Sequence, residues 1–265
     1  MIKLGVNTVL YKKYTLEEAA AELSKIGYDG MEVSAIEGMC EHLDLKNYKN
    51  QKNQINEISE KYNLALLSTE VASTDPERVR LAFEACSYIG IPIVNIGPGG
   101  KMDDEDSFAA SLENISNLAK MADEYKINLC MKAHVGCAVY NTPTTIRAIE
   151  KIKNEFFGID MDPSHIYRAN EEPENALDAV AKAMKHVHIR DCEGRGPSPG
   201  DPLKQICGSG DINLYDYFKV LVNTGYNGPV CLEVIGRELE LSEANIVAGT
   251  SYGYMNAILK NLKAR

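Results

Sequence analysis

The sequence lacks long apolar runs, clustered basic residues and paired-cysteine motifs, and each absence removes a class of protein. No stretch approaches the ~20 apolar residues that a membrane-spanning helix needs, and we expect no secretory signal. The net charge is −10, which argues against nucleic acid as a partner. The seven cysteines form no CxxC motif, so we expect neither a disulfide framework nor a zinc knuckle. These features are typical of a cytoplasmic protein that keeps its thiols reduced and binds a small molecule, with no membrane partner.

A glycine-rich GxGxxG loop is also missing after the first apolar segment, where a doubly wound open sheet usually carries one. What the chain does have is eight short apolar segments, most of them followed by an amphipathic one. Its 265 residues are close to the ~250 of a complete eightfold barrel. We therefore predict an α/β fold, a single (β/α)₈ TIM barrel formed by residues 1–265 as one domain, with the open sheet as the alternative. The predicted strands are 3–8, 30–35, 65–71, 92–97, 128–135, 157–163, 186–191 and 229–235.

Ionisable residues gather at the carboxyl ends of the last three predicted strands, where barrel enzymes build their active sites. Asp162 ends strand 157–163, and His165 follows it in the loop. His188 lies near the end of strand 186–191, and Glu233 interrupts an otherwise apolar strand, where an unpaired carboxylate would be costly. Asp162, His188 and Glu233 either ligate one divalent metal or form a buried ion-pair network that holds the barrel mouth.

Four motifs together resemble a known superfamily over essentially the whole chain: residues 27–33 (GYDGMEV), 162–165 (DPSH), 186–191 (HVHIRD) and 228–233 (GPVCLE). The sequence is similar to the xylose isomerase-like barrels, which include sugar phosphate isomerases and epimerases, inosose dehydratases, ketose 3-epimerases and endonuclease IV. The resemblance implies one divalent metal (manganese, magnesium or zinc) held by Glu, Asp, His and Glu from strands five to eight. The last three of these match Asp162, His188 and Glu233, and His165 matches a residue that contacts substrate oxygens.

The sequence departs from the family pattern on the fifth strand, where Glu-x-His is usual. Lys132 stands at the position of the expected glutamate, and His134 keeps its register. Either a reduced ligand set tolerates the metal, or Lys132 occupies the metal's place and pairs with Asp162 and Glu233. Lys132 is then a structural ion-pair partner, a catalytic acid/base or enolate stabiliser, or a Schiff-base lysine.

Other candidates lie near the same end of the barrel. Glu70, late in the third strand, is a compensating ligand, a base or a plain polar rim residue. Arg190 or Arg195 is expected to bind a hydroxyl, carboxylate or phosphate, since a guanidinium suits bidentate anions. We expect the long segment 192–211 to be a lid, segment 97–101 to face an anion or form a plain turn, and the loop 37–45 with His42 to supply the opposite wall.

These residues predict an isomerase or epimerase of a sugar or sugar derivative. A base, Glu233 or Glu70, removes a proton next to a carbonyl, while Lys132 and His134 assist at the carbonyl and a cation stabilises the enediolate. Two alternatives stay open. One is a lyase or dehydratase acting on a sugar or cyclitol derivative, and the other is a noncatalytic carbohydrate-binding homologue. A homo-oligomer is compatible with either.

Overall fold

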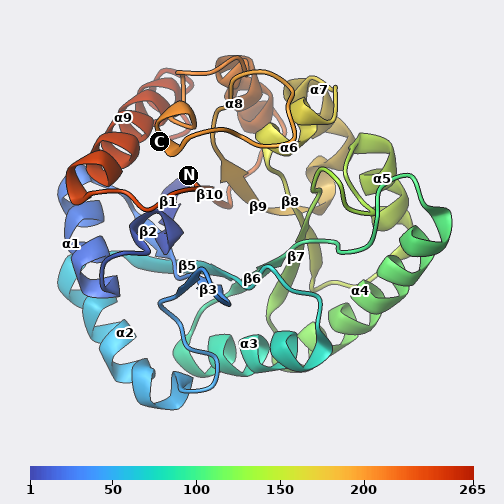
Figure 1. The fold of residues 1–265 in the computed structure, drawn as a ribbon, viewed down its shortest axis with the longest axis horizontal. Helices are drawn as coiled ribbons and strands as arrows, with labels where there is room; N and C mark the ends of the chain where they lie inside the picture. The colour runs from blue at the N-terminus through green and yellow to red at the C-terminus, as the bar shows by residue number, and fades with distance from the viewer.

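Eight parallel strands close into a barrel in the computed structural model, which describes residues 1–265 (Figure 1). Neighbours around the barrel follow the order β1-β10-β9-β8-β7-β6-β5-β2, so the predicted (β/α)₈ TIM barrel is confirmed. The barrel strands are β1 (Lys3–Asn7), β2 (Gly30–Glu32), β5 (Ala65–Glu70), β6 (Ile93–Ile96), β7 (Asn128–Lys132), β8 (Phe157–Asp160), β9 (Met184–Ile189) and β10 (Pro229–Leu232).

Helices form a ring outside the barrel (Figure 1). They are α1 (Leu16–Ile26), α2 (Tyr48–Tyr62), α3 (Pro76–Ile89), α4 (Glu105–Tyr125), α5 (Thr142–Lys151), α6 (Pro163–Arg168), α7 (Pro173–Val180), α8 (Leu214–Asn223) and α9 (Leu241–Asn261), with 3-10 turns η1 (Thr8–Tyr11), η2 (Ala181–Ala183) and η3 (Pro202–Lys204). Local caps begin several of them: Thr15 and Glu18 form a capping box on α1, and Asp75 caps α3 ahead of Pro76. None of the helices has the length and apolar character needed to cross a bilayer.

The apolar core and the polar interior occupy different places. One continuous cluster of buried aliphatic and aromatic side chains fills the space between the strands and the helices. The amino-terminal end of the barrel is closed by Leu67 against two glycines, since a Cβ at Gly5 would lie 2.5 Å from Leu67 Cδ1 and one at Gly30 would lie 2.7 Å from Leu67 Cγ. Above this plug the barrel interior is polar, so the strands carry ionisable side chains toward the carboxyl end.

All eight predicted strands end one to three residues early, and two of these differences shape the mouth. The register shifts between Met31 and Glu32, after which the chain leaves the barrel and forms a hairpin of β3 (Ala35–Ile36) and β4 (Cys40–Glu41). Strand β8 ends at Asp160, and Asp162 caps α6 by accepting the Ser164 N–H, so His165 lies on a helix rather than in a loop. Pro163 at the first helical position favours this early start.

Candidate active site

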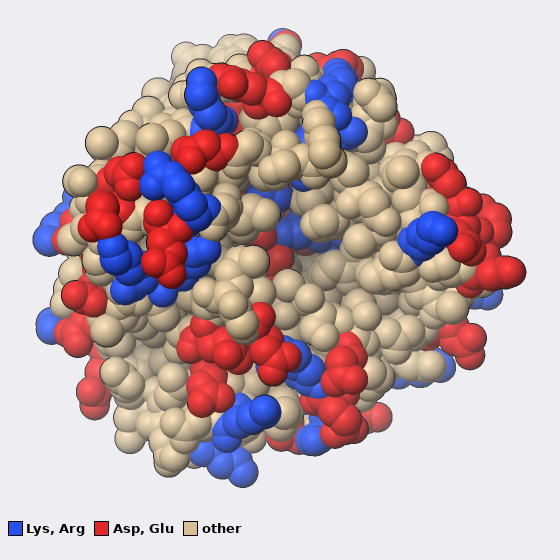
Figure 2. Space-filling model, in the orientation of Figure 1, with Lys and Arg blue, Asp and Glu red and all other residues tan.

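A cavity of about 300 Å³ opens at the carboxyl end of the barrel. Figure 2 shows the corresponding hollow at the centre of this face, with basic and acidic atoms at its bottom. Its lining includes six of the residues predicted from sequence: Glu70, Lys132, His134, His165, Arg190 and Glu233. Strands and loops far apart in the chain therefore converge on one small space.

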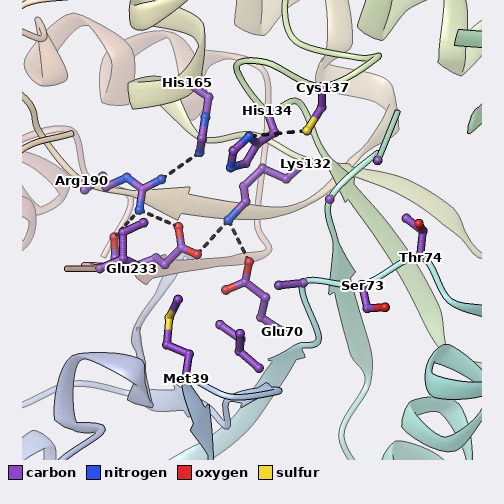
Figure 3. A pocket seen from close by; sticks show the side chains of 15 residues that line it. Met39, Glu70, Ser73, Thr74, Lys132, His134, Cys137, His165, Arg190 and Glu233 are labelled. Carbon is purple, nitrogen blue, oxygen red and sulfur yellow. Dashed lines mark hydrogen bonds and ion pairs between the residues drawn. The ribbon is translucent and has the colours of Figure 1, made fainter. Parts of the chain in front are cut away.

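Lys132 lies at the floor of this cavity, at the end of β7. Its Nζ is 2.9 Å from Glu70 Oε1 and 2.8 Å from Glu233 Oε1. Figure 3 marks both contacts with dashed lines. All three side chains are at least nine-tenths buried. Burial opposes the charge on Lys132, but Glu233 and Glu70 outweigh it and raise the pKa of the ammonium above its ordinary value. The lysine is therefore a fixed cation at neutral pH.

The two carboxyl groups beside Lys132 differ in character. Glu70 also accepts a hydrogen bond from Asn7 Nδ2 at 2.8 Å, and burial, helped by the nearby charge of Glu233, raises the pKa of Glu70 to about 8. Burial works against ionisation of Glu233 too, but Lys132 and Arg190 hold the pKa of Glu233 well below its usual value. Glu233 is thus a permanent anion, whereas Glu70 titrates near physiological pH.

Arg190 contacts both Glu233 and Asp162. Its Nη1 lies 3.0 Å from Glu233 Oε2 and its Nη2 lies 2.8 Å from Asp162 Oδ2. The other oxygen of Asp162 accepts hydrogen bonds from the backbone N–H and the hydroxyl of Ser164, at 2.8 and 2.7 Å. Both oxygens of Asp162 are therefore engaged within the protein.

A network of buried charges lies below Lys132. Each ring nitrogen of His188 is 2.6 Å from a carboxylate oxygen, Nδ1 from Asp160 Oδ2 and Nε2 from Glu32 Oε1. His186 lies 3.0 Å from Asp160 and 3.2 Å from Glu32 through its two nitrogens. Burial disfavours charge on His188, but Asp160 and Glu32 overcome it and raise the pKa of the imidazole well above its ordinary value. This network supports the cavity floor without reaching the cavity.

The expected metal ligands do not fit a divalent cation in this arrangement. Arg190 bridges Asp162 and Glu233, and both nitrogens of His188 face carboxylates. The Lys132 ammonium lies 3.2 Å from His188 Nδ1, in the space that a shared ion would need. Lys132 pairs with Glu233 as anticipated, but its second partner is Glu70 rather than Asp162, because Arg190 holds Asp162.

Three other groups of side chains are close enough to hold an ion, and all are fully buried. They are Asp160, His186 and His188; Glu32, His186 and Cys231; and Glu32, Glu70 and His188. These groups overlap, and most of their nitrogen and oxygen atoms already contact one another. Their residue types make a possible metal-binding cluster, which lies below the cavity and reaches it only through Glu70.

Two histidines form the opposite side of the cavity. The rings of His134 and His165 lie 4.0 Å apart between centroids. His134 Nδ1 is 2.9 Å from the carbonyl oxygen of Val135, which leaves Nε2 without a protein partner, and His165 contacts Arg168 and Arg190 at 2.9 Å. Burial and, to a lesser extent, the positive charge of Lys132 lower the pKa of His134. Burial and then the positive charge of Arg190 lower the pKa of His165 well below its usual value. Both imidazoles are neutral at physiological pH.

The structure does not bring every predicted residue to the cavity. His42 Nε2 is 2.8 Å from the carbonyl oxygen of Tyr14, and Arg195 donates to the carbonyl oxygens of Tyr167 and Glu171, at 2.7 and 3.0 Å. Neither His42 nor Arg195 lines the cavity. The prediction for His42 and Arg195 rests on the loops that carry them, and in the structure each side chain contacts backbone carbonyl oxygens instead.

The loops that line the cavity also differ in part from expectation. Segment 192–211 contributes no lining residue, because the buried Asp191 carboxylate binds the backbone N–H groups of Cys192, Gly208 and Ile212 and holds the segment aside. The 37–45 loop does contribute, through Met39 on the hairpin. Sequence reasoning missed residues 72–74 and Cys137, whose small side chains give no signal of a binding role.

Comparison with known proteins gives one family. The model of the family described as xylose isomerase-like TIM barrel matches residues 20–253. An inosose dehydratase from Clostridium beijerinckii is 20% identical over 88% of this chain and 89% of its own length, and a fructoselysine 3-epimerase from Escherichia coli O157:H7 is 19% identical over 97% and 98%. The solved structure of the IOLI protein with a binding zinc atom has a TM-score of 0.79 at 16% identity, covering 98% of this chain and 99% of that one. Structural likeness at such identity shows the fold alone.

Proposed function

The chain belongs to the xylose isomerase-like TIM barrel family, and from that premise we propose that it is a carbohydrate isomerase or epimerase that moves a proton at a carbon next to a carbonyl. Relatives with 3-epimerase and dehydratase activity by name support a carbohydrate or cyclitol substrate. The cavity of about 300 Å³ is at the small end of the range for ligand pockets, which suits one monosaccharide or cyclitol ring.

The observation that carries the proposal is the Lys132 ammonium at the cavity floor between Glu70 and Glu233. An enediolate develops negative charge on the former carbonyl oxygen, and a fixed, desolvated cation stabilises that charge more than it stabilises the neutral ketone. Two of the three ammonium hydrogens point at carboxylates and the third faces His188 Nδ1 at 3.2 Å, a longer contact that a substrate oxygen would replace. We assign this electrostatic role to Lys132 in place of a Schiff base, since a tightly paired ammonium is a poor nucleophile.

Glu70 is the proton carrier in this proposal. A general base works best when its pKa lies near the operating pH, and burial brings the pKa of Glu70 to about 8. Glu233 is less suited, because Lys132 and Arg190 occupy both of its oxygens and keep it ionised. The neutral His134, with its free Nε2, is placed to bind a substrate hydroxyl, and His165, whose ring nitrogens contact Arg168 and Arg190, lines the cavity beside it.

A second candidate function, that of a dehydratase, is favoured by the raised pKa of Glu70. Once the ionised Glu70 carboxylate has taken the substrate proton, a pKa of about 8 keeps that proton on it at neutral pH, and the carboxyl group is able to pass it to a leaving hydroxyl, which departs as water. Loss of water after the same proton abstraction would make the enzyme a lyase.

Product analysis by NMR in D₂O separates the two reactions. The purified chain is incubated with ketohexoses and with inosose, and a Glu70→Gln variant serves as the matched control. Isomerisation or epimerisation gives a product of unchanged formula with deuterium at the carbon next to the carbonyl, whereas dehydration gives a product that lacks one water. A folded wild-type chain that binds these sugars without any exchange would contradict both reactions and favour a noncatalytic binding protein.

A further inference from the structure

The residues at the carboxyl end of the barrel depart from the metal site that the family resemblance implies. We propose that the Lys132 ammonium takes the place of the divalent metal, so that this site operates with a cation supplied by the chain itself. The inference deepens the proposed function and rests on it for the identity of the reaction. It does not depend on the reaction for its evidence, which is geometric.

The net charge of the site supports the replacement of the metal by the Lys132 ammonium. A glutamate carboxylate together with a divalent cation carries one positive unit, and a single ammonium carries the same charge. Exchanging the expected glutamate for Lys132 while omitting the metal therefore leaves the total charge of the site unchanged. Keeping the metal as well would add two positive units to a site that is at least nine-tenths buried, where uncompensated charge is strongly unfavourable.

Each cation at the cavity floor already has two carboxyl partners. Lys132 lies 2.8 Å from Glu233 and 2.9 Å from Glu70, and Arg190 lies 3.0 Å from Glu233 and 2.8 Å from Asp162. Arg190 places one terminal nitrogen against each of those carboxylates, which the several donors of a guanidinium allow. A metal would have to displace both cations from their carboxylates before it could bind them.

The third expected ligand also has partners already. His188 Nε2 is 2.6 Å from Glu32 Oε1, and His188 Nδ1 lies 2.6 Å from Asp160 Oδ2 and faces the Lys132 ammonium. Lys132 Nζ lies 3.2 Å from His188 Nδ1 and 2.8 Å from Glu233 Oε1, between two of the positions that would share an ion. The ammonium thus fills the space beside two of the expected ligands.

Titration with Mn²⁺ tests the inference without any need for turnover. Isothermal calorimetry and elemental analysis after dialysis are applied to the wild-type chain, to Lys132→Glu and to Asp162→Asn. The wild type is expected to show no saturable Mn²⁺ site. Lys132→Glu restores the missing carboxylate and is expected to gain one site, with an increase in affinity above the roughly 10–100-fold that a second-shell partner contributes.

Two results would overturn the inference. One is a stoichiometric Mn²⁺ or Zn²⁺ site in the wild type that Asp162→Asn abolishes. The other is a folded Lys132→Glu chain, as judged by circular dichroism, with no gain in Mn²⁺ affinity. Should that variant fail to fold, Lys132→Gln removes the ammonium at similar length, and a smaller gain is expected from it; no gain there overturns the inference equally. If the wild type neither turns over sugars nor binds Mn²⁺, the proposed function is wrong and the inference about Lys132 stands. If it isomerises sugars with tightly bound Mn²⁺, the inference is wrong and the proposed function stands.

Discussion

The ammonium nitrogen of Lys132 lies 2.8 Å from Glu233 Oε1, and this contact links the ends of β7 and β10 across the barrel mouth. The two strands are not neighbours in the barrel, since β8 and β9 lie between them. The pair therefore connects separate parts of the cavity floor. Arg190, which directly follows β9, contacts the other carboxylate oxygen of Glu233.

Removing the charge of Glu233 is expected to destabilise the fold. Glu233→Gln leaves Lys132 and Arg190 with one buried anion fewer, and breaking a buried pair in this way typically costs about 3–5 kcal/mol. Urea unfolding followed by circular dichroism measures the change. The matched control is Glu240→Gln, whose partner Lys13 is exposed, and little change is expected there. Equal, small effects of both substitutions would contradict a buried ionic role for Glu233.

The pH dependence of proton abstraction is expected to follow Glu70. A base acts in its ionised form, so kcat/KM should rise with pH and level off above the pKa of about 8. Glu70→Gln should lower kcat by about 10²–10⁴-fold and remove this ionisation from the residual rate. Glu77→Gln, on the exposed start of α3, is the control and should leave the profile unchanged. A wild-type profile that is flat between pH 6 and about 9 would argue against Glu70 as the base.

The two arginines predicted to bind substrate are expected to behave differently. Arg190→Lys replaces a bridging fork by a point charge that cannot hold Asp162 and Glu233 at once, so kcat/KM should fall by about 10²-fold. Arg195→Lys changes a residue outside the cavity and should leave kcat/KM near the wild-type value. Steady-state kinetics on both folded variants is the measurement. A large loss in the Arg195 variant with a small one in the Arg190 variant would show that the cavity is wrongly assigned.

Gly30, at the amino-terminal end of the barrel, is expected to be required for close packing. A Cβ at position 30 would lie 2.4 Å from the backbone oxygen of Ala65, so Gly30→Ala should destabilise by at least about 1–3 kcal/mol. Gly249, inside α9, has open space around it, and Gly249→Ala should stabilise by about 0.5–1 kcal/mol. Thermal unfolding of the two variants should therefore shift in opposite directions, and a shared direction would contradict the tight closure of the floor.

Much of the fold and the inner part of the site could be predicted from the sequence. Apolar segments that alternate with amphipathic ones are a local signal, and it is repeated eight times, so errors at single boundaries did not alter the topology. The place of Lys132, Glu70 and Glu233 at the barrel mouth followed from their positions near strand ends, because parallel strands of a barrel end at the same face.

Contacts between distant segments could not be predicted in the same way. Nothing in the sequence near Asp162 indicates that Arg190 holds it, so the second partner of Lys132 was wrongly expected to be Asp162 rather than Glu70. The anchoring of segment 192–211 depends on Asp191 binding backbone groups up to 21 residues away, and its composition alone suggested a lid. Side-chain pairing across a barrel depends on register and rotamer, which local patterns do not specify.

The most direct test is deuterium exchange by enzyme that has been treated with EDTA and dialysed. A carbohydrate substrate from the NMR survey is incubated in D₂O with the wild type and with Lys132→Gln. Exchange at the carbon next to the carbonyl is expected at the same rate before and after EDTA, with a loss of about 10²–10³-fold in the Lys132 variant, as for removal of one donor to a developing oxyanion. Exchange that EDTA abolishes and Mn²⁺ restores, or exchange that survives in the folded Lys132→Gln chain, would contradict it.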